Sequence, residues 1–376
     1  MIFSINRDYL LNKLNIIQRG LPIKTPMPVL YGIKFNVNKD NIVLTSSNTD
    51  IAIQVILDKK ESNVKVEGKT LVPGKYLIDI VRKVNSNIVE FSLIETNLLI
   101  IKADRSEFKL RLLDVEDYPD IEFIQENSPI IFQNNELKKI IRETSYATSN
   151  SEKRPVLTGV DLKFENQKLT CVATDSYRLA RKEIDFDLNQ NTFDIIVPNK
   201  SLDELFKILE STNENIELYT KPNKILFKFE KILFQTRLLE GQYPDTSRII
   251  PKEYLIEIPF HKEQLISAID RVSLLSPKEK ETNINIIRLS LREDKIVEIS
   301  STNTEIGDAL EELIPSGEIK GKKIKLAFSS KYLKEALKVY HSDEVLLKFS
   351  GETKPFIITG KSDPSLVNLI LPVRID

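Results

Sequence analysis

Apolar residues recur with a helical period in three segments that lie far apart along the chain. In each segment they fall near positions i, i+3 or i+4, and i+7, a spacing that predicts an amphipathic α-helix. The expected helices start near leucines that are spaced 127 and 128 residues apart: Leu10, Leu137 and Leu265. This regular spacing indicates that the chain is built from repeats.

Further landmarks follow the same period. Residues 28–32 read PVLYG, and residues 155–159 read PVLTG, again 127 residues later. A polar turn follows an alternating strand pattern at three matching positions: Asn48, Asp175 and Asn303. A second helical pattern begins in each repeat beside a lysine: Lys75, Lys200 and Lys331. Four landmarks in one order at nearly one period predict three similar domains.

Each repeat is expected to run helix, strands, turn, strands, helix, strands over about 125 residues, a length that suits one domain. The strand pattern is clear at residues 159–164 and 225–229, where apolar and polar side chains alternate. Residues that break regular structure cluster near 126–129 and 251–253. The fold class is therefore predicted as α+β, with three tandem domains: residues 1–125, 126–250 and 251–376.

Composition narrows the choice of function. The formal net charge of −1 is unlike that of a basic nucleic-acid-binding protein, so any DNA-facing surface must come from segregated charge. Cys171 is the only cysteine, which excludes an internal disulfide and a thiolate metal cage. The first residues show no signal-peptide pattern, and no apolar run approaches the ~20 residues of a membrane span. These features predict a cytoplasmic protein.

A search for catalytic groups identifies no reaction centre, so no catalytic residue, cofactor or metal ligand is predicted. His261 and His341 do not have a metal-binding spacing, and His261 is expected to cap a helix or to lie on the surface. Residues 68–70 read GKT, like the end of a phosphate-binding loop, but Asn63 stands where the first glycine would be. A strand-like context there argues against a nucleotide site.

Carboxylates at related positions leave a metal-dependent enzyme acting on DNA as an alternative. Asp120 and Asp245 lie in Tyr-Pro-Asp turns, where an aspartate commonly accepts hydrogen bonds from its own backbone. Asp175 lies at a strand end, where the same local role is expected. The local role is favoured for all three, and loss of a magnesium-dependent activity in Asp175→Asn would instead support the enzyme.

Three motifs carry a resemblance to a known family. Residues 173–180 read ATDSYRLA and are similar to the ATDGHRLA segment of the bacterial DNA sliding clamps, the beta subunits of DNA polymerase III. Residues 239–245, LEGQYPD, with Arg248 and Pro251, resemble the end of that family's second domain. The segment 371–374, LPVR, resembles its closing tail. With the threefold repeat, the resemblance covers the whole chain.

The resemblance implies a non-catalytic processivity factor that tethers the replicative polymerase to DNA. It also implies a head-to-tail homodimer in which six domains form a ring around duplex DNA, with helices inside and sheets outside. Such a ring holds DNA by topology, so weak phosphate contacts without sequence preference are sufficient and permit sliding. The implied partners are double-stranded DNA, the polymerase catalytic subunit, the clamp loader, and repair and ligation factors that carry clamp-binding peptides.

The residues expected to face DNA are basic and lie on the predicted helices or adjoining loops. They are Lys13, Lys24, Arg82, Lys139, Arg142, Arg154, Lys200, Lys262 and Lys334. The alternative for each is a solvent-exposed helix residue that only aids solubility. Lys24, Arg154 and Lys200 match motif-anchored positions of the family and are the stronger candidates.

The family binds partner peptides in a hydrophobic cleft between the second and third domains, which is the mode of capture expected here. Carried over by motif, its residues are Leu157, Thr174, Ser176, Tyr177, Arg178, Leu179, Pro244, Arg248, Ile249, Pro355, Leu369, Leu371, Pro372, Val373 and Arg374. Ser176 replaces a glycine and Tyr177 a histidine of the family pattern, and Leu371 and Val373 replace methionines, which puts the peptide preference in doubt. The alternative for the aliphatic members is ordinary core packing.

The resemblance also points to a dimer contact. Leu274 and Leu275 are expected to face Lys75 of the neighbouring copy, and edge strands of the first and third domains are expected to pair across the junction. Two adjacent leucines after a helix could equally be buried within their own domain.

A three-domain scaffold that binds peptides without encircling DNA is the third hypothesis. Threefold repetition disfavours the metal-dependent enzyme, since one active site does not need three matched domains. Lysines on the helices disfavour the scaffold. The sliding clamp is therefore the favoured interpretation of the sequence.

Overall fold

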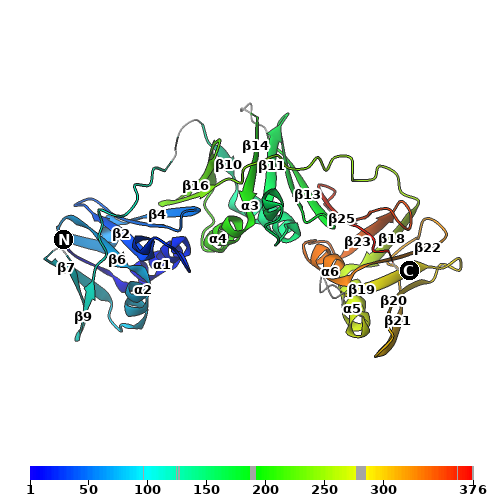
Figure 1. Cartoon of the computed structure of the whole chain (residues 1–376), viewed down its shortest axis with the longest axis horizontal. Helices are drawn as coiled ribbons and strands as arrows, with labels where there is room; N and C mark the ends of the chain where they lie inside the picture. Colours follow the sequence, from blue (N-terminus) through cyan, green and yellow to red (C-terminus); the bar gives the residue numbers. More distant parts are fainter. Residues whose placement is uncertain are drawn as a thin grey trace. The chain divides into compact units, whose positions relative to one another are not determined.

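The computed structural model describes residues 1–95, 97–123, 125, 128–186, 192–276, 285–361 and 363–374. The chain separates into two compact units (Figure 1). The first unit comprises Met1–Lys138 and Lys200–Leu238, and the second comprises Lys139–Asn199 and Leu239–Asp376. Neither unit coincides with a sequence repeat.

The six predicted helices are confirmed. The first helix of each repeat is α1 (Arg7–Ile17), α3 (Asn134–Thr144) and α5 (Lys262–Val272). The second helix of each repeat is α2 (Gly74–Lys83), α4 (Asn199–Leu209) and α6 (Ser330–Lys338). The predicted period of α1 corresponds to its buried face, because Leu10, Leu14 and Ile17 are the buried residues of that helix.

The expected order was wrong at the start of each repeat, because a strand precedes the first helix. These strands are β1 (Ile2–Asn6), β10 (Ile130–Phe132) and β18 (Ile256–His261). In the first and third repeats the helix begins at the residue that follows the strand, so the change from a two-residue to a helical period has no breaker to mark it.

The first unit contains two antiparallel sheets. One has the strand order β5-β1-β7-β8-β9, and the other has the order β10-β15-β16-β17-β4-β3-β2-β6. Their remaining strands are β2 (Gly32–Val37), β3 (Ile42–Ser47), β4 (Ile51–Leu57), β5 (Ser62–Val66), β6 (Gly68–Pro73), β7 (Ile88–Ile94), β8 (Leu98–Ala103), β9 (Ser106–Arg111), β15 (Ile216–Lys221), β16 (Lys224–Phe229) and β17 (Ile232–Arg237).

The second unit also contains two antiparallel sheets. Their strand orders are β14-β11-β12-β13-β25-β24-β23-β18 and β21-β20-β19-β22. The remaining strands are β11 (Gly159–Glu165), β12 (Lys168–Thr174), β13 (Arg178–Asp185), β14 (Phe193–Pro198), β19 (Ile286–Leu291), β20 (Val297–Asn303), β21 (Gly307–Leu313), β22 (Ile324–Ser329), β23 (Glu344–Phe349), β24 (Phe356–Gly360) and β25 (Leu366–Ile370). The predicted strands at 159–164 and 225–229 are confirmed as β11 and β16.

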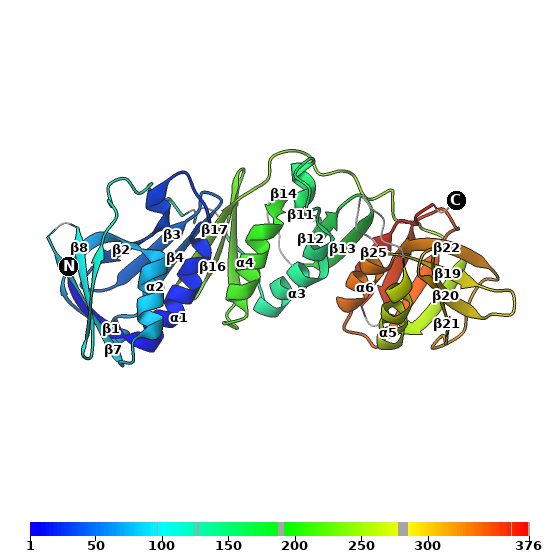
Figure 2. The same cartoon turned by 60° about the horizontal axis from the view of Figure 1, so that its bottom comes forward.

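Each eight-stranded sheet runs across two consecutive repeats. β4 of the first repeat pairs with β17 of the second, and β13 of the second pairs with β25 of the third. Backbone hydrogen bonds therefore join the repeats, which is why the compact units cut through the second repeat. Helices α1 and α2 pack together in the first unit, as α5 and α6 do in the second (Figure 2).

Close contacts explain why the residue after the repeated PVL-containing segment is glycine in both repeats. A Cβ on Gly32 would lie 2.5 Å from the side chain of Leu71, and a Cβ on Gly159 would lie 2.7 Å from the carbonyl oxygen of Val197. Neither neighbour leaves room for a side chain at the start of the strand. The same close approach of the neighbouring strand thus explains why glycine recurs in both repeats.

The remaining sequence expectations concern local roles. His261 is exposed at the start of α5, and its side chain makes no capping hydrogen bond, so the surface role is confirmed and the capping role is wrong. The GKT segment lies in strand β6, not in a phosphate-binding loop before a helix. In the described part of the chain, no helix is long and apolar enough to cross a membrane.

Candidate functional site

One face of the second unit's eight-stranded sheet carries a compact apolar cluster. Its buried members come from four adjacent strands: Val172, Leu179, Ile357 and Leu369. Leu369 is the cross-strand partner of both Leu179 and Ile357, which brings the second and third repeats together at this point. Four partly buried residues pack against the cluster: Tyr243, Ile250, Tyr254 and Val367.

Several of these residues were missed in the sequence analysis. Tyr243 belongs to the Tyr-Pro-Asp motif, but the neighbouring Pro244 was chosen instead. Ile357 is identified only by its cross-strand pairing with Leu369, and no sequence pattern reveals that pairing. Val172 could have been predicted from the strand alternation, since it lies two residues before Thr174 and therefore on the same side of β12.

The turn between β12 and β13 is fixed by its own side chains. Asp175 Oδ1 accepts hydrogen bonds from the backbone nitrogens of Tyr177 and Arg178 at 2.9 and 3.0 Å. The hydroxyl of Thr174 donates to the carbonyl of Arg178 at 2.5 Å and accepts from the nitrogen of Ser176 at 3.1 Å. Ser176 has a φ of 79°, in the region that glycine favours, and the turn leaves Tyr177 55% exposed.

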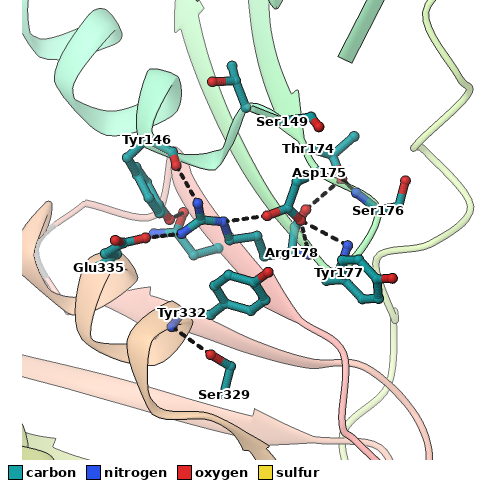
Figure 3. A network of polar contacts seen from close by, with 12 residues as sticks. Tyr146, Ser149, Thr174, Asp175, Ser176, Tyr177, Arg178, Ser329, Tyr332 and Glu335 are labelled. Carbon is teal, nitrogen blue, oxygen red and sulfur yellow. Dashed lines mark hydrogen bonds and ion pairs between the residues drawn. The ribbon is translucent and has the colours of Figure 1, made fainter. Parts of the chain in front are cut away.

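Arg178 does not share a surface with the apolar cluster. Successive strand residues point to opposite faces, so Arg178 faces away from the side of the sheet on which Leu179 lies. Its Nε donates to Asp175 at 3.0 Å, its Nη2 donates to the carbonyl of Tyr146 at 2.6 Å, and its Nη1 pairs with Glu335. Figure 3 shows this guanidinium between the two carboxylates and the ring of Tyr332. With only 7% of its surface exposed, Arg178 anchors the turn.

The residues after β25 extend along the same region. The nitrogen of Leu371 donates to the carbonyl of Tyr177 at 2.9 Å, and the nitrogen of Val373 donates to the carbonyl of Ala327 at 2.7 Å. These bonds hold the segment 371–373 beside the turn and leave its side chains half-buried. Tyr243 is also bonded to the turn, because its hydroxyl accepts a hydrogen bond from the backbone nitrogen of Thr174 at 3.0 Å.

The other predicted cleft residues differ in exposure. Leu157, Leu179 and Leu369 are buried, so core packing accounts for much of their surface. Pro355 and Pro372 are half-buried. The remaining members are exposed: Ser176, Tyr177, Pro244, Arg248, Ile249 and Arg374. The arrangement is an apolar floor edged by aromatic, aliphatic and basic side chains, which suits an extended peptide.

The predicted aspartates serve local roles where the structure shows their bonds. Asp245 Oδ1 accepts hydrogen bonds from the nitrogen and hydroxyl of Ser247 at 2.9 and 2.7 Å. These bonds lower the pKa of Asp245. Asp175 supports its turn and Arg178, as described above. Among the described residues, no group of three or more histidines, cysteines or carboxylates is placed to hold a metal ion.

A buried ion-pair network lies on the helix side of the same sheet. Lys182 of β13 lies 3.0 Å from Glu143 of α3 and 2.7 Å from Asp363, and Lys139 lies 2.8 Å from Asp363. Lys182 is 3% exposed and Glu143 is 1% exposed. Burial raises the pKa of Glu143, partly offset by Lys182. Burial would also raise the pKa of Asp363, but the hydrogen bonds from Lys139 and Lys182 outweigh it and hold the pKa well below its usual range.

The basic residues predicted to face DNA divide into two groups. Five are exposed: Lys24, Arg82, Arg142, Arg154 and Lys200. The other four are less exposed and contact neighbours: Lys13 contacts Glu230, Lys139 contacts Asp363, Lys262 contacts the carbonyl of Tyr340 and Lys334 contacts Asp270. Arg82, although exposed, also lies 3.2 Å from Asp79. Four further exposed helix lysines were not chosen, although the same helical patterns contained them: Lys83, Lys207, Lys331 and Lys338.

The predicted dimer residues lie on the surface. Leu274, in a short 3-10 helix at Ser273–Leu275, is 79% exposed, so burial within its own domain does not explain it. Leu275 is half-buried, and Lys75 is exposed at the start of α2. The short helix contacts β21, where Leu310 is 65% exposed.

Comparison with known proteins supplies the family. Residues 1–122, 132–245 and 247–374 match the N-terminal, central and C-terminal domain families of the DNA polymerase III beta subunit. The chain is 37% identical over 379 residues to a beta sliding clamp of Staphylococcus epidermidis, covering 100% of this chain and 99% of that one. A Staphylococcus aureus beta sliding clamp is similar to the same extent.

Solved structures agree over the whole chain. A DNA polymerase sliding clamp from Bacillus subtilis has a TM-score of 0.95 at 35% identity, with 100% of each chain covered. A DNA polymerase III beta chain from Streptococcus pneumoniae has a TM-score of 0.95 at 33% identity, also with 100% of each chain covered. With three matched domains in the same order, this chain belongs to the DNA polymerase III beta subunit family, the bacterial sliding clamps.

Proposed function

We propose that two copies of this chain associate head to tail into a six-domain ring that encircles duplex DNA and raises the processivity of the replicative polymerase. The domains are residues 1–125, 126–250 and 251–376. The ring is non-catalytic, and the polymerase catalytic subunit, the clamp loader, and repair and ligation factors bind it through short peptides. The apolar cluster around Leu179 and Leu369 receives those peptides, and Tyr177, Arg248 and the segment 371–374 edge the site.

The repeated strand pairing carries this proposal. In the first two repeats the strand after the polar turn, β4 or β13, pairs with the last strand of the following repeat, β17 or β25. β21 occupies that position in the third repeat, and β9 is the last strand of the first. Among the described residues, β21 pairs only with β20 and β9 only with β8. A second copy offers its β9 to this free edge, and the reciprocal contact closes the ring.

The repeat also gives the register and chemistry of that contact. Ile53 faces Phe234 and Ala180 faces Asn368 in the two observed junctions, so the equivalent pair is Asp308 with Phe108 of the second copy. β21 carries three carboxylates, Asp308, Glu311 and Glu312, whereas β9 carries two cations, Lys109 and Arg111, with one carboxylate, Glu107. Opposite charges on the two edges favour this pairing over self-pairing of either edge.

Leu274→Asp is expected to raise the dimer dissociation constant by about 30-fold, because a truncated central interface contact costs roughly 2 kcal/mol. Electron microscopy of concentrated wild-type protein should show closed six-lobed rings, and the variant should show open particles at the same concentration. Sedimentation would give the constants. Leu255→Asp is the matched control, since Leu255 is also a well-exposed leucine of the third repeat but lies beside β18. Three-lobed wild-type particles at high concentration would contradict the ring.

Lys24→Glu combined with Arg154→Glu is expected to weaken duplex DNA binding equally on unrelated sequences. Each lost phosphate contact should also reduce the slope of log affinity against log salt by about 1. Fluorescence anisotropy with two duplexes of different sequence measures both quantities. Lys69→Glu, an exposed lysine on strand β6, serves as the control and should change neither. A change in sequence preference would count against encirclement.

A further inference from the structure

The first unit contains a cavity at the edge where β4 of the first repeat meets β17 of the second. Its volume is about 280 Å³. Apolar side chains from the first repeat line it: Met27, Leu30, Ile51, Pro119 and Ile121. This volume lies just below the roughly 300–1,000 Å³ of ligand pockets, which suits one anchoring side chain rather than a whole ligand.

The turn beside this cavity repeats the hydrogen bonds of the turn at the proposed peptide site. Asn48 Oδ1 accepts from the nitrogens of Asp50 and Ile51 at 3.1 and 2.8 Å, as Asp175 does in the second repeat. The hydroxyl of Ser47 donates to the carbonyl of Ile51 at 3.0 Å, as that of Thr174 does to Arg178. Thr49 has a φ of 80°, and Ser176 has a φ of 79°.

The surrounding strands and tyrosine also correspond. Gln235 is the cross-strand partner of Ala52, just as Leu369 is the cross-strand partner of Leu179. Gln235 and Leu369 therefore occupy equivalent positions at the two junctions. Burial raises the pKa of Tyr118, and the backbone of Ser47 partly offsets the effect. Burial likewise raises the pKa of Tyr243, and the hydrogen bond with the backbone of Thr174 partly offsets this rise. The two junctions therefore share one framework.

The chemistry of the two sites differs where a peptide would lie. At the first junction, Gln235 stands in place of Leu369 and Asp50 stands in place of Tyr177. Lys224 and Arg237, which face each other on β16 and β17, stand in place of Pro355 and Leu371. The first junction therefore has an apolar pocket with a charged rim where the second junction has an apolar floor.

The rim charges around this cavity have no partners among the described residues. Three are carboxylates of the first repeat, one from the turn and two from the segment near the end of that repeat: Asp50, Asp120 and Glu122. Two are the neighbouring cations Lys224 and Arg237. In the parts of the chain that the structure describes, none of the five forms an ion pair within 4.0 Å. An apolar pocket rimmed by unpaired charges of both signs is complementary to a ligand with an apolar centre and a charge of each sign.

We propose that this cavity is a second peptide-binding site, which takes an aliphatic side chain flanked in its peptide by one basic and one acidic residue. The acidic residue faces Lys224 and Arg237, and the basic residue faces Asp50, Asp120 and Glu122. A partner that carries both this segment and a clamp-binding peptide would gain affinity by occupying two sites of one chain. The inference takes its geometry from the proposed peptide site but can be tested apart from it.

Two designed peptides test the site in both chain directions: acetyl-Gly-Lys-Leu-Asp-Gly-amide and acetyl-Gly-Asp-Leu-Lys-Gly-amide. Methyl NMR of the full chain follows Met27, Ile51 and Ile121, which line the cavity. One of the peptides is expected to shift these signals with a dissociation constant of about 1 mM or lower. Acetyl-Gly-Ser-Leu-Ser-Gly-amide should bind about fivefold more weakly, since it lacks the ion pairs. Equal binding of all three peptides, or no shift with any, would overturn the proposal.

Charge reversal provides the second test. Lys224→Glu with Arg237→Glu should lower the affinity of the preferred charged peptide about fivefold and leave that of the serine peptide unchanged. Lys69→Glu is again the control. Leu371→Asp, which alters the other site, should leave the shifts at Ile51 intact. If the charge reversal changes nothing while the peptide still shifts Ile51, the assigned recognition is wrong, and the proposed function of the other site is unaffected.

Discussion

Lys182→Met is expected to lower the free energy of opening the second unit's large sheet by about 3–5 kcal/mol, the usual cost of leaving a buried charge unpaired. Glu143 is 1% exposed and would lose its partner at 3.0 Å, with Lys139 next at 3.8 Å. Hydrogen exchange of the β13 amides under urea measures this local free energy without assuming that the whole chain unfolds in one step.

The control for this prediction is Lys168→Met, because Lys168 lies 3.3 Å from Glu183 of β13 in the same sheet but its side chain is 46% exposed. Its loss should cost no more than about 1 kcal/mol. Replacing both Lys182 and Glu143 by apolar residues should recover most of the loss. If Lys182→Met costs no more than the exposed control, the network does not stabilise the sheet.

The pH dependence of the Lys182→Met variant follows from Glu143. Burial already raises the pKa of this carboxyl, and loss of Lys182 removes the largest of the interactions that lower it. A folded-state pKa above the unfolded value of about 4.3 means that the native state binds the proton more tightly. The variant should therefore regain stability relative to wild type as the pH falls below the raised pKa of Glu143, and lose it again as the pH rises through that pKa.

Removal of the residues from Leu371 onward is expected to lower the affinity for a polymerase clamp-binding peptide at least ~100-fold, or roughly 2.7 kcal/mol. The truncation takes away the half-buried side chains of Leu371, Pro372 and Val373 and the backbone bond from Leu371 to Tyr177. Fluorescence anisotropy with a labelled peptide gives the affinity, and sedimentation should give an unchanged dimer constant.

A point variant separates loss of the peptide contact from general damage to the sheet. Leu371→Asp places a charge at the edge of the apolar floor while the backbone bond to Tyr177 can remain. It should weaken peptide binding strongly, whereas Leu255→Asp, at an exposed leucine that is not a member of the apolar cluster, should not. Unchanged affinity in both the truncation and Leu371→Asp would place the peptide site elsewhere.

Much of the site could be selected from motifs, but its division into two faces could not. The ATDSYRLA segment pointed to Thr174, Tyr177 and Leu179 near the apolar cluster, and also to Arg178, which the strand alternation turns to the opposite face. Ile357 carries no motif, and it joins the cluster only because β24 and β25 pair beside β13. Those contacts depend on residues more than a hundred positions apart, which no local pattern specifies.

The sequence by itself determined the repeat, the six helices and the turns that recur at Asn48 and Asp175. These are local properties, since helical period, strand alternation and Asx-type hydrogen bonding involve residues within a few positions of one another. Only the tertiary structure decided that β4 pairs with β17 and β13 with β25, and that β9 and β21 keep one free edge among the described strands. The physical reason is that a strand's backbone hydrogen bonds can be made with any neighbour of suitable register, so the choice of neighbour is set by the packing of whole repeats.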